Sequence, residues 1–218
     1  MSLVSYHNNP KLKNSIIDEM REHQNADLII KGRYGQENGV FKGCAVGCAI
    51  HSMNVRLGKH YPTNSHVSYE EAIGVPEWLA RLHDTIFEGL PDKENTQFAV
   101  DLLAAIPVGK DLALVKWKFC AFILSENIKR VLALKNISDE LKKQVVDAIR
   151  GVLKVHEEAI KTDEWNESAA RSAESAAWSA ARSAESAARS AAWSAESAAW
   201  SAAYKKYAKE LKRILELV

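Results

Sequence analysis

An 11-residue repeat of small residues fills most of the last quarter of the chain. From Ser168 the sequence runs SAARSAESAAW, SAARSAESAAR, SAAWSAESAAW and SAAY. Its serines step by 4, 3 and 4 residues, which gives about 3.67 residues per turn, close to the 3.6 of an unstrained α-helix. Alanine is the strongest helix former, and neither glycine nor proline interrupts the repeat. The repeat therefore predicts one long, straight helix over residues 163–218.

The period also sorts the side chains of this helix onto separate faces. Serines cover one face, alanines a second, and every large side chain falls on one narrow stripe. The interaction stripe consists of Arg171, Glu174, Trp178, Arg182, Glu185, Arg189, Trp193, Glu196, Trp200 and Tyr204. Small residues let two helices approach closely, and tryptophan adds the apolar area that alanine lacks. We expect the helix to pack on its own domain or on a second chain; a solvated linker helix is the alternative.

The residues before the repeat show helical periodicity and almost no strand pattern. Helices are expected over residues 10–32, 44–57, 68–74, 76–89, 96–106 and 111–134, and a further helix is expected from residue 138 through at least Leu153. Asn9, Thr96 and Ser138 are expected N-caps, and Ser68 with Glu71 an expected capping box. The helix over 111–134 is the most apolar and is expected to lie at the centre of the domain.

The predicted fold class is all-α. A compact helical bundle over residues 1–162 precedes the repeat helix over residues 163–218, whose apolar end is expected to dock on the domain or on a partner. A glycine-rich stretch at residues 33–42 is the one place for a small β-hairpin.

The balance of charges, the lengths of the apolar runs and the number of cysteines indicate which classes of protein this chain is expected to belong to. The chain has 29 basic and 28 acidic residues, whereas nucleic-acid and membrane-surface proteins normally present a basic face. No apolar run approaches the roughly 20 residues of a membrane span, and the N-terminus lacks a signal-peptide pattern. Three cysteines, an odd number, are typical of a reduced compartment. We expect a cytoplasmic protein that binds neither nucleic acid nor a membrane.

The residues Cys44, Cys48 and His51 are the strongest candidates for chemistry. They form the pattern C-x3-C-x2-H, and on a helix they share one face. Thiolate and imidazole suit zinc, and a cysteine near a helix start can act as a nucleophile with a lowered pKa. Candidates for a fourth zinc ligand are His23, His60 and His66. The usual zinc spacing is missing, so tight helix packing of small residues is favoured over a metal or thiol site.

A second candidate is the carboxylate pair Asp84 and Glu88, four residues apart beside His83. Such a pair can serve acid–base catalysis, but a solvated helix face is the expected role.

Three sequence blocks resemble a group of uncharacterised bacterial and phage-borne proteins. The blocks are GCAVGCAIHS, GVPEWLARLHDTIFEGLP and AIPVGKDLALV, within roughly residues 10–135. The group carries them in the same order before an Ala-rich helical C-terminus, so the resemblance implies common ancestry but no activity. The matching residues are Gly43, Cys44, Gly47, Cys48, His51, Pro76, Leu79, Leu82, Phe87, Glu88, Gly89, Leu90, Pro91, Pro107, Gly109 and Asp111. Most are typical of turns and core, and any site is expected at residues 44–51 with Glu88 and Asp111.

These patterns favour a non-enzymatic protein without a cofactor that assembles with itself or a protein partner through its repeat helix. A metal- or thiol-dependent enzyme centred on Cys44, Cys48 and His51, with zinc as its metal, is the alternative.

Overall fold

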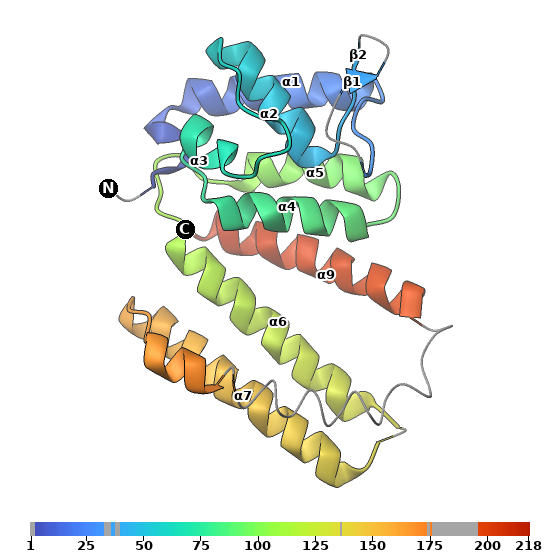
Figure 1. The fold of residues 1–218 in the computed structure, drawn as a ribbon, viewed down its shortest axis with the longest axis vertical. Coiled ribbons are helices and arrows are strands. Elements are labelled where there is room, and N and C mark those ends of the chain that lie inside the picture. Colours follow the sequence, from blue (N-terminus) through green and yellow to red (C-terminus); the bar gives the residue numbers. More distant parts are fainter. Residues whose placement is uncertain (1–2, 33–35, 38–39, 136, 174, 176–195) are drawn as a thin grey trace. The chain divides into compact units, whose positions relative to one another are not determined.

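The computed structural model describes residues 3–32, 36–37, 40–135, 137–173, 175 and 196–218 (Figure 1). Its helices are α1 (Pro10–Asn25), α2 (Ala45–Leu57), α3 (Ser68–Ile73), α4 (Glu77–Gly89), α5 (Glu94–Ala105), α6 (Ala113–Ala133), α7 (Asp139–Thr162) and α9 (Glu196–Glu216). Residues 167–173 are helical as well. The predicted all-α class is confirmed. Strand β1 (Gln36–Glu37) pairs antiparallel with β2 (Val40–Phe41) inside the predicted hairpin window.

The contacts group the chain into two compact units. Unit 1 comprises residues 1–112 and 200–218, and unit 2 comprises residues 113–199. The C-terminal end thus belongs with the N-terminal helices, and unit 2 is an insertion between them. The domain boundary predicted near residue 162 falls inside unit 2 in this grouping and stays a prediction.

Helix α2 lies at the centre of unit 1, where it packs against α1, α3, α4 and α5. Most of its residues are buried, including Ile50 and Met53. Its small residues Ala45, Gly47 and Ala49 let several helices approach at once. The prediction that the helix at 111–134 is central is wrong, because only Val115, Phe119 and Glu126 are buried in α6. Apolar content alone did not identify the central helix.

The N-terminal residues hold the C-terminal end of α5. Pro107 has no N–H, so the carbonyl of Leu103, four residues earlier, lacks its intrahelical donor. The buried hydroxyl of Tyr6 donates to that carbonyl at 2.6 Å. The ammonium of Lys13 donates to the carbonyl of Ala104, also at 2.6 Å. A long-range contact thus supplies the caps that the local sequence cannot.

Tyr6 reaches this position from a left-handed turn over residues 5–8. Positive φ angles occur at Tyr6 (53°), His7 (49°) and Asn8 (57°), and this conformation costs roughly 1–2 kcal/mol per residue. The turn is fixed by its neighbours, since the N–H of Ser5 donates to the carbonyl of Lys110 at 3.0 Å.

The end of α9 completes the core of unit 1 beside α4 and α5 (Figure 1). Leu211, Ile214 and Leu215 are buried, and Tyr204 lies so close to Gly89 of α4 that a Cβ there would overlap its ring. The apolar end of the predicted repeat helix therefore docks on the chain's own domain.

Two ion pairs accompany this packing. Lys205 contacts Glu94 at 2.6 Å, and Lys212 contacts Asp101 at 2.7 Å. Because all four side chains are partly exposed to solvent, these pairs fix the register of α9 on α5 more than they add stability.

Unit 2 is built on α6 and α7, which pack together as an antiparallel helical hairpin (Figure 1). The hydroxyl of Ser138 accepts from the N–H of Leu141 at 3.2 Å, which confirms the predicted N-cap of α7. After α7 the chain turns at Asp163, whose φ is 59°. Trp165 then stacks on Trp117 of α6, with ring centroids 6.2 Å apart.

The predicted repeat helix is described only near its two ends. Residues 167–173 and 196–216 are helical, while residues 176–195 lie outside the described residues. One continuous helix therefore stays a prediction. At the start of the repeat, the Glu167 carboxylate contacts the Arg171 guanidinium four residues later at 3.0 Å.

Two predicted helix ends are wrong. Helix α1 ends at Asn25 instead of near residue 32, because Asp27 has a positive φ and the N–H of Ile30 donates to the carbonyl of Gly43. Helix α5 begins at Glu94, two residues before Thr96.

The predicted capping box at Ser68 is also wrong. The hydroxyl of Ser68 donates to the carbonyl of Pro62 at 3.1 Å and caps nothing in α3. The N-cap of α1 is confirmed, because the side chain of Asn9 accepts from the N–H of Lys11 at 3.0 Å. None of the described helices is long and apolar enough to cross a membrane.

Candidate functional sites

Cys44 stands immediately before α2 and is its N-cap. Its sulfur accepts from the N–H of Gly47 at 3.4 Å, and the residue is 1% exposed. Burial raises the pKa of this thiol, and the neighbouring carboxylate of Asp84 raises it further. A helix N-terminus normally lowers a thiol pKa, but here burial and a negative neighbour outweigh it. Cys44 is therefore a protonated, inaccessible thiol and not an activated nucleophile.

Cys48, one turn further along α2, is fully buried. Its thiol donates to the carbonyl of Gly43 at 3.4 Å, and the carbonyl of Leu28 lies 3.6 Å away. Burial raises the pKa of Cys48 to about 12, so the sulfur is a neutral donor at pH 7. A metal would need the thiolate instead.

The structure does not bring Cys44, Cys48 and His51 into a metal-binding group. In the part of the chain that the structure describes, no set of three His, Cys, Asp or Glu side chains is arranged to hold a metal ion. The two thiols face a carboxylate and backbone carbonyls, and His51 faces aromatic rings.

His51 instead belongs to an aromatic cluster between α1, α2 and β2. Its ring stacks on Phe41, with centroids 4.2 Å apart and planes at 21°. The ring of His23, at the end of α1, meets it edge-on at 5.2 Å and 73°. The sequence offered His23 only as one of several spare ligands, because helix spacing on α2 cannot show which residue of α1 lies opposite.

A second buried polar group lies between α3 and α4. The hydroxyl of Tyr69 lies 3.1 Å from Nδ1 of His83, and both residues are buried. Burial raises the pKa of Tyr69 and lowers that of His83 to about 4. Both groups are therefore neutral at pH 7, and they share one hydrogen bond.

Asp84 and Glu88 have different surroundings, so the predicted solvated carboxylate face is wrong for Asp84. The Asp84 side chain is 14% exposed and lies 3.4 Å from Nε2 of His66. Glu88 is exposed and accepts from the N–H of Gly32 at 2.9 Å. The helical spacing was right, but α3 and its preceding loop cover only the Asp84 end of the face.

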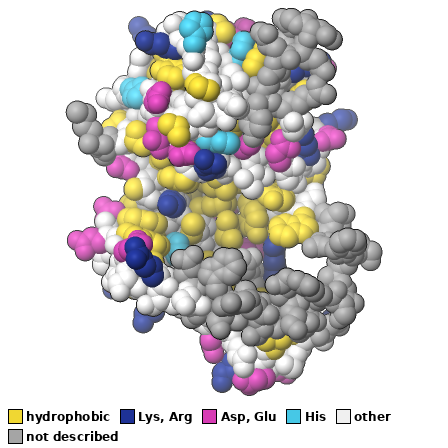
Figure 2. Space-filling model, in the orientation of Figure 1, with side chains coloured by type: hydrophobic (Ala, Val, Ile, Leu, Met, Phe, Trp, Pro, Cys, Tyr) yellow, Lys and Arg dark blue, Asp and Glu magenta, His cyan; other side chains and the backbone are white. Residues whose placement is uncertain are grey.

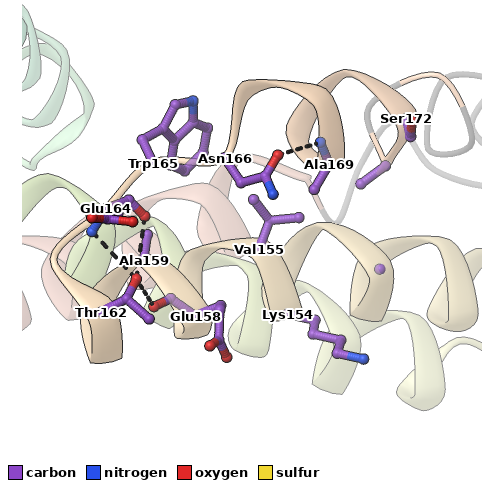
Figure 3. Close-up of a pocket in the computed structure, with 12 residues that line it drawn as sticks. Lys154, Val155, Glu158, Ala159, Thr162, Glu164, Trp165, Asn166, Ala169 and Ser172 are labelled. Carbon is purple, nitrogen blue, oxygen red and sulfur yellow. Dashed lines mark hydrogen bonds between the residues drawn. The ribbon is translucent and has the colours of Figure 1, made fainter.

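Unit 2 carries an open groove of about 800 Å³ beside α7. It is lined by Gly151, Lys154, Val155, Glu158, Ala159, Thr162, Glu164, Trp165, Asn166, Ala169, Ser172 and Ala173. Val155 points from α7 toward the segment that carries Asn166 and Ala169 (Figure 3). Its floor combines small side chains from α7 with alanines from the first unit of the repeat. The sequence could not reveal this groove, because the turn at Asp163 brings the two segments together.

The predicted interaction stripe is divided between the units. Arg171 is exposed in unit 2, while Trp200 and Tyr204 lie in unit 1, where the Trp200 ring is 49% exposed. Outside the described side chains lie Glu174, Trp178, Arg182, Glu185, Arg189, Trp193 and Glu196. Charged side chains of both signs occur on the visible face of the described residues (Figure 2).

Comparison with known proteins adds no identification: no protein family, no curated protein and no solved structure matches the chain.

Proposed function

We propose that this chain is a non-enzymatic assembly protein in which the Ser/Ala repeat of one copy packs into the α7 groove of a second copy. The main support for this proposal is the shape and lining of the groove beside α7. Its floor on α7 is formed by Gly151, Val155 and Ala159, which stand four residues apart on one helix face.

The chemistry of the groove matches that of the repeat. A floor of small residues lets a second helix approach closely, provided that the second helix also presents small residues. The repeat supplies them over its whole length as alanines and serines. Ala169 and Ala173, which belong to the repeat, already form part of the groove wall. A second repeat segment would meet side chains like its own, as in a symmetric homodimer.

Tryptophan supplies the area that small residues lack. Trp165 stands beside the groove and is 39% exposed, and the repeat contributes Trp178 and Trp193. Interfaces gain most of their energy from such large aromatic side chains. The three unpaired cysteines fit a cytoplasmic location for this assembly.

The alternative function, an enzyme centred on Cys44, Cys48 and His51, has weaker support. Both of these cysteines are buried and have raised pKa values, whereas thiol catalysis requires an accessible thiolate.

Light scattering coupled to size-exclusion chromatography tests the proposal. A Cβ at Gly151 would meet nothing within 4 Å, so Gly151→Leu places a large side chain in the groove without disturbing α7. The full chain is expected to be dimeric or larger, and Gly151→Leu to shift it to monomer. Gly151→Ala, which leaves the groove open, is the matched control and is expected to keep the assembly. A full chain that stays monomeric at every concentration would contradict the proposal, and so would an assembly that Gly151→Leu leaves intact.

A further inference from the structure

The rings of His23 and His51 each present a buried nitrogen that no group in the described part of the chain satisfies. Nε2 of His23 and Nδ1 of His51 are both shielded from solvent, and neither has a hydrogen-bond partner among the described residues. His23 is 7% exposed. A buried polar atom without a partner costs about 1–3 kcal/mol, and most such atoms in proteins are paired. Two of them on neighbouring rings that meet edge-on point to a shared ligand.

The separation of the rings suits a shared cation. An imidazole nitrogen lies about 2 Å from a bound zinc ion, which places each ring centroid about 3 Å from the metal. Two such rings at a tetrahedral angle have centroids about 5 Å apart. The observed separation is 5.2 Å, with planes at 73°.

The surroundings also favour a cation. Glu19 and Glu22 of α1 lie close enough for their charges to act on His51 and His23 respectively. Glu19 also pairs with Arg56 at 2.8 Å, which orients its carboxylate. Phe41, stacked on His51, limits the rotation of that ring. The two ligands come from different helices of unit 1, α1 and α2, which pack together.

We infer that His23 and His51 form a two-histidine site for a borderline transition-metal cation, with Zn²⁺ as the test ion. Imidazole is a preferred ligand of zinc, copper and nickel. The protein supplies two ligands, so the remaining positions belong to water or to an external ligand. This site differs from the set Cys44, Cys48 and His51, because the metal bridges α1 and α2 and contacts no sulfur. It is independent of the assembly proposed for unit 2.

Titration of the metal-free full chain with Zn²⁺, monitored by isothermal titration calorimetry, tests the site. One ion per chain is expected, and His23→Gln and His51→Gln are each expected to weaken binding at least about tenfold, since each removes half of the protein ligands. His60→Gln, at an exposed position, is the matched control and is expected to change nothing. No stoichiometric binding, or binding that survives both substitutions, would overturn the inference.

Cobalt binding to the unmodified chain gives a second result that does not depend on the folding of any variant. Co²⁺ bound by two imidazoles and water is expected to show d–d absorption without a sulfur-to-metal charge-transfer band. A charge-transfer band would place Cys44 or Cys48 in the site and overturn the assignment, as would the absence of any cobalt spectrum.

Discussion

His83 links the stability of unit 1 to pH through a single buried imidazole. Burial lowers its pKa from 6.5 to about 4 in the folded chain. Between these two pH values, His83 is protonated in the unfolded chain but stays neutral in the folded chain. As the pH falls through 6.5 toward 4, this proton uptake favours unfolding. The contribution of His83 to the free energy of unfolding is therefore fully present above pH 6.5 and is about 3 kcal/mol smaller at pH 4.

Urea unfolding between pH 7 and pH 4, compared with His83→Gln, measures this contribution. The stability difference between the two proteins is expected to shrink or reverse as the pH falls, because glutamine accepts from Tyr69 but does not titrate. Tyr69→Phe leaves His83 buried and is expected to keep the pH dependence. A difference that stays constant across this pH range would show that His83 does not control it.

Tyr6 makes a hydrogen bond that the sequence of α5 requires. Because Pro107 leaves the Leu103 carbonyl without a helical donor, Tyr6→Phe buries that carbonyl unpaired. We expect a loss of about 1–2 kcal/mol in the free energy of unfolding, measured by urea denaturation. Tyr6→Leu, which also removes ring volume, should lose more. Equal stability of Tyr6→Phe and the unmodified chain would rule out this capping role.

At the scale of elements, alanine substitutions at two helical glycines distinguish the effect of helix propensity on stability from the effect of packing. At Gly151 in α7 a Cβ meets nothing within 4 Å, whereas at Gly89 in α4 it would overlap the ring of Tyr204 in α9. Gly151→Ala is expected to stabilise by about 0.5–1 kcal/mol through helix propensity. Gly89→Ala is expected to destabilise by about 1–3 kcal/mol through overpacking. Thermal unfolding of both variants checks the opposite signs, and stabilisation by Gly89→Ala would show that α9 does not pack this closely.

Local sequence patterns predicted where most helices lie, but they did not predict which helices pack against one another. The N-caps Asn9 and Ser138 were correct because a side chain and the backbone two or three residues later decide them. The caps on α5 were not foreseen, since Tyr6 is 97 residues from the carbonyl it satisfies. His23 and His51 were recognised as metal-ligand types, but their pairing depends on how α1 packs on α2. Sequence periodicity gives the face of a helix and not the helix that it meets.

At the scale of the whole molecule, the connection between the units predicts which pieces of the chain can fold. Residues 200–218 belong to unit 1, so a chain that ends at Thr162 lacks Leu211, Ile214 and Leu215. Each buried side chain of this kind contributes about 1.5–3 kcal/mol, and the total stability of a domain is about 5–15 kcal/mol. We expect the chain ending at Thr162 to lose its cooperative unfolding transition.

A chain in which a flexible linker replaces residues 113–199 should behave differently, because it keeps α9. About 20 Gly/Ser residues span roughly 25 Å on average, and the joined ends, Leu112 and Trp200, lie in the same unit. Circular dichroism during heating is expected to show a cooperative transition for this chain and none for the shorter one. The reverse outcome would mean that α9 is dispensable and that the boundary near residue 162 describes the folding unit. Cooperative unfolding of the linker chain would show that unit 1 folds without the residues between its two segments.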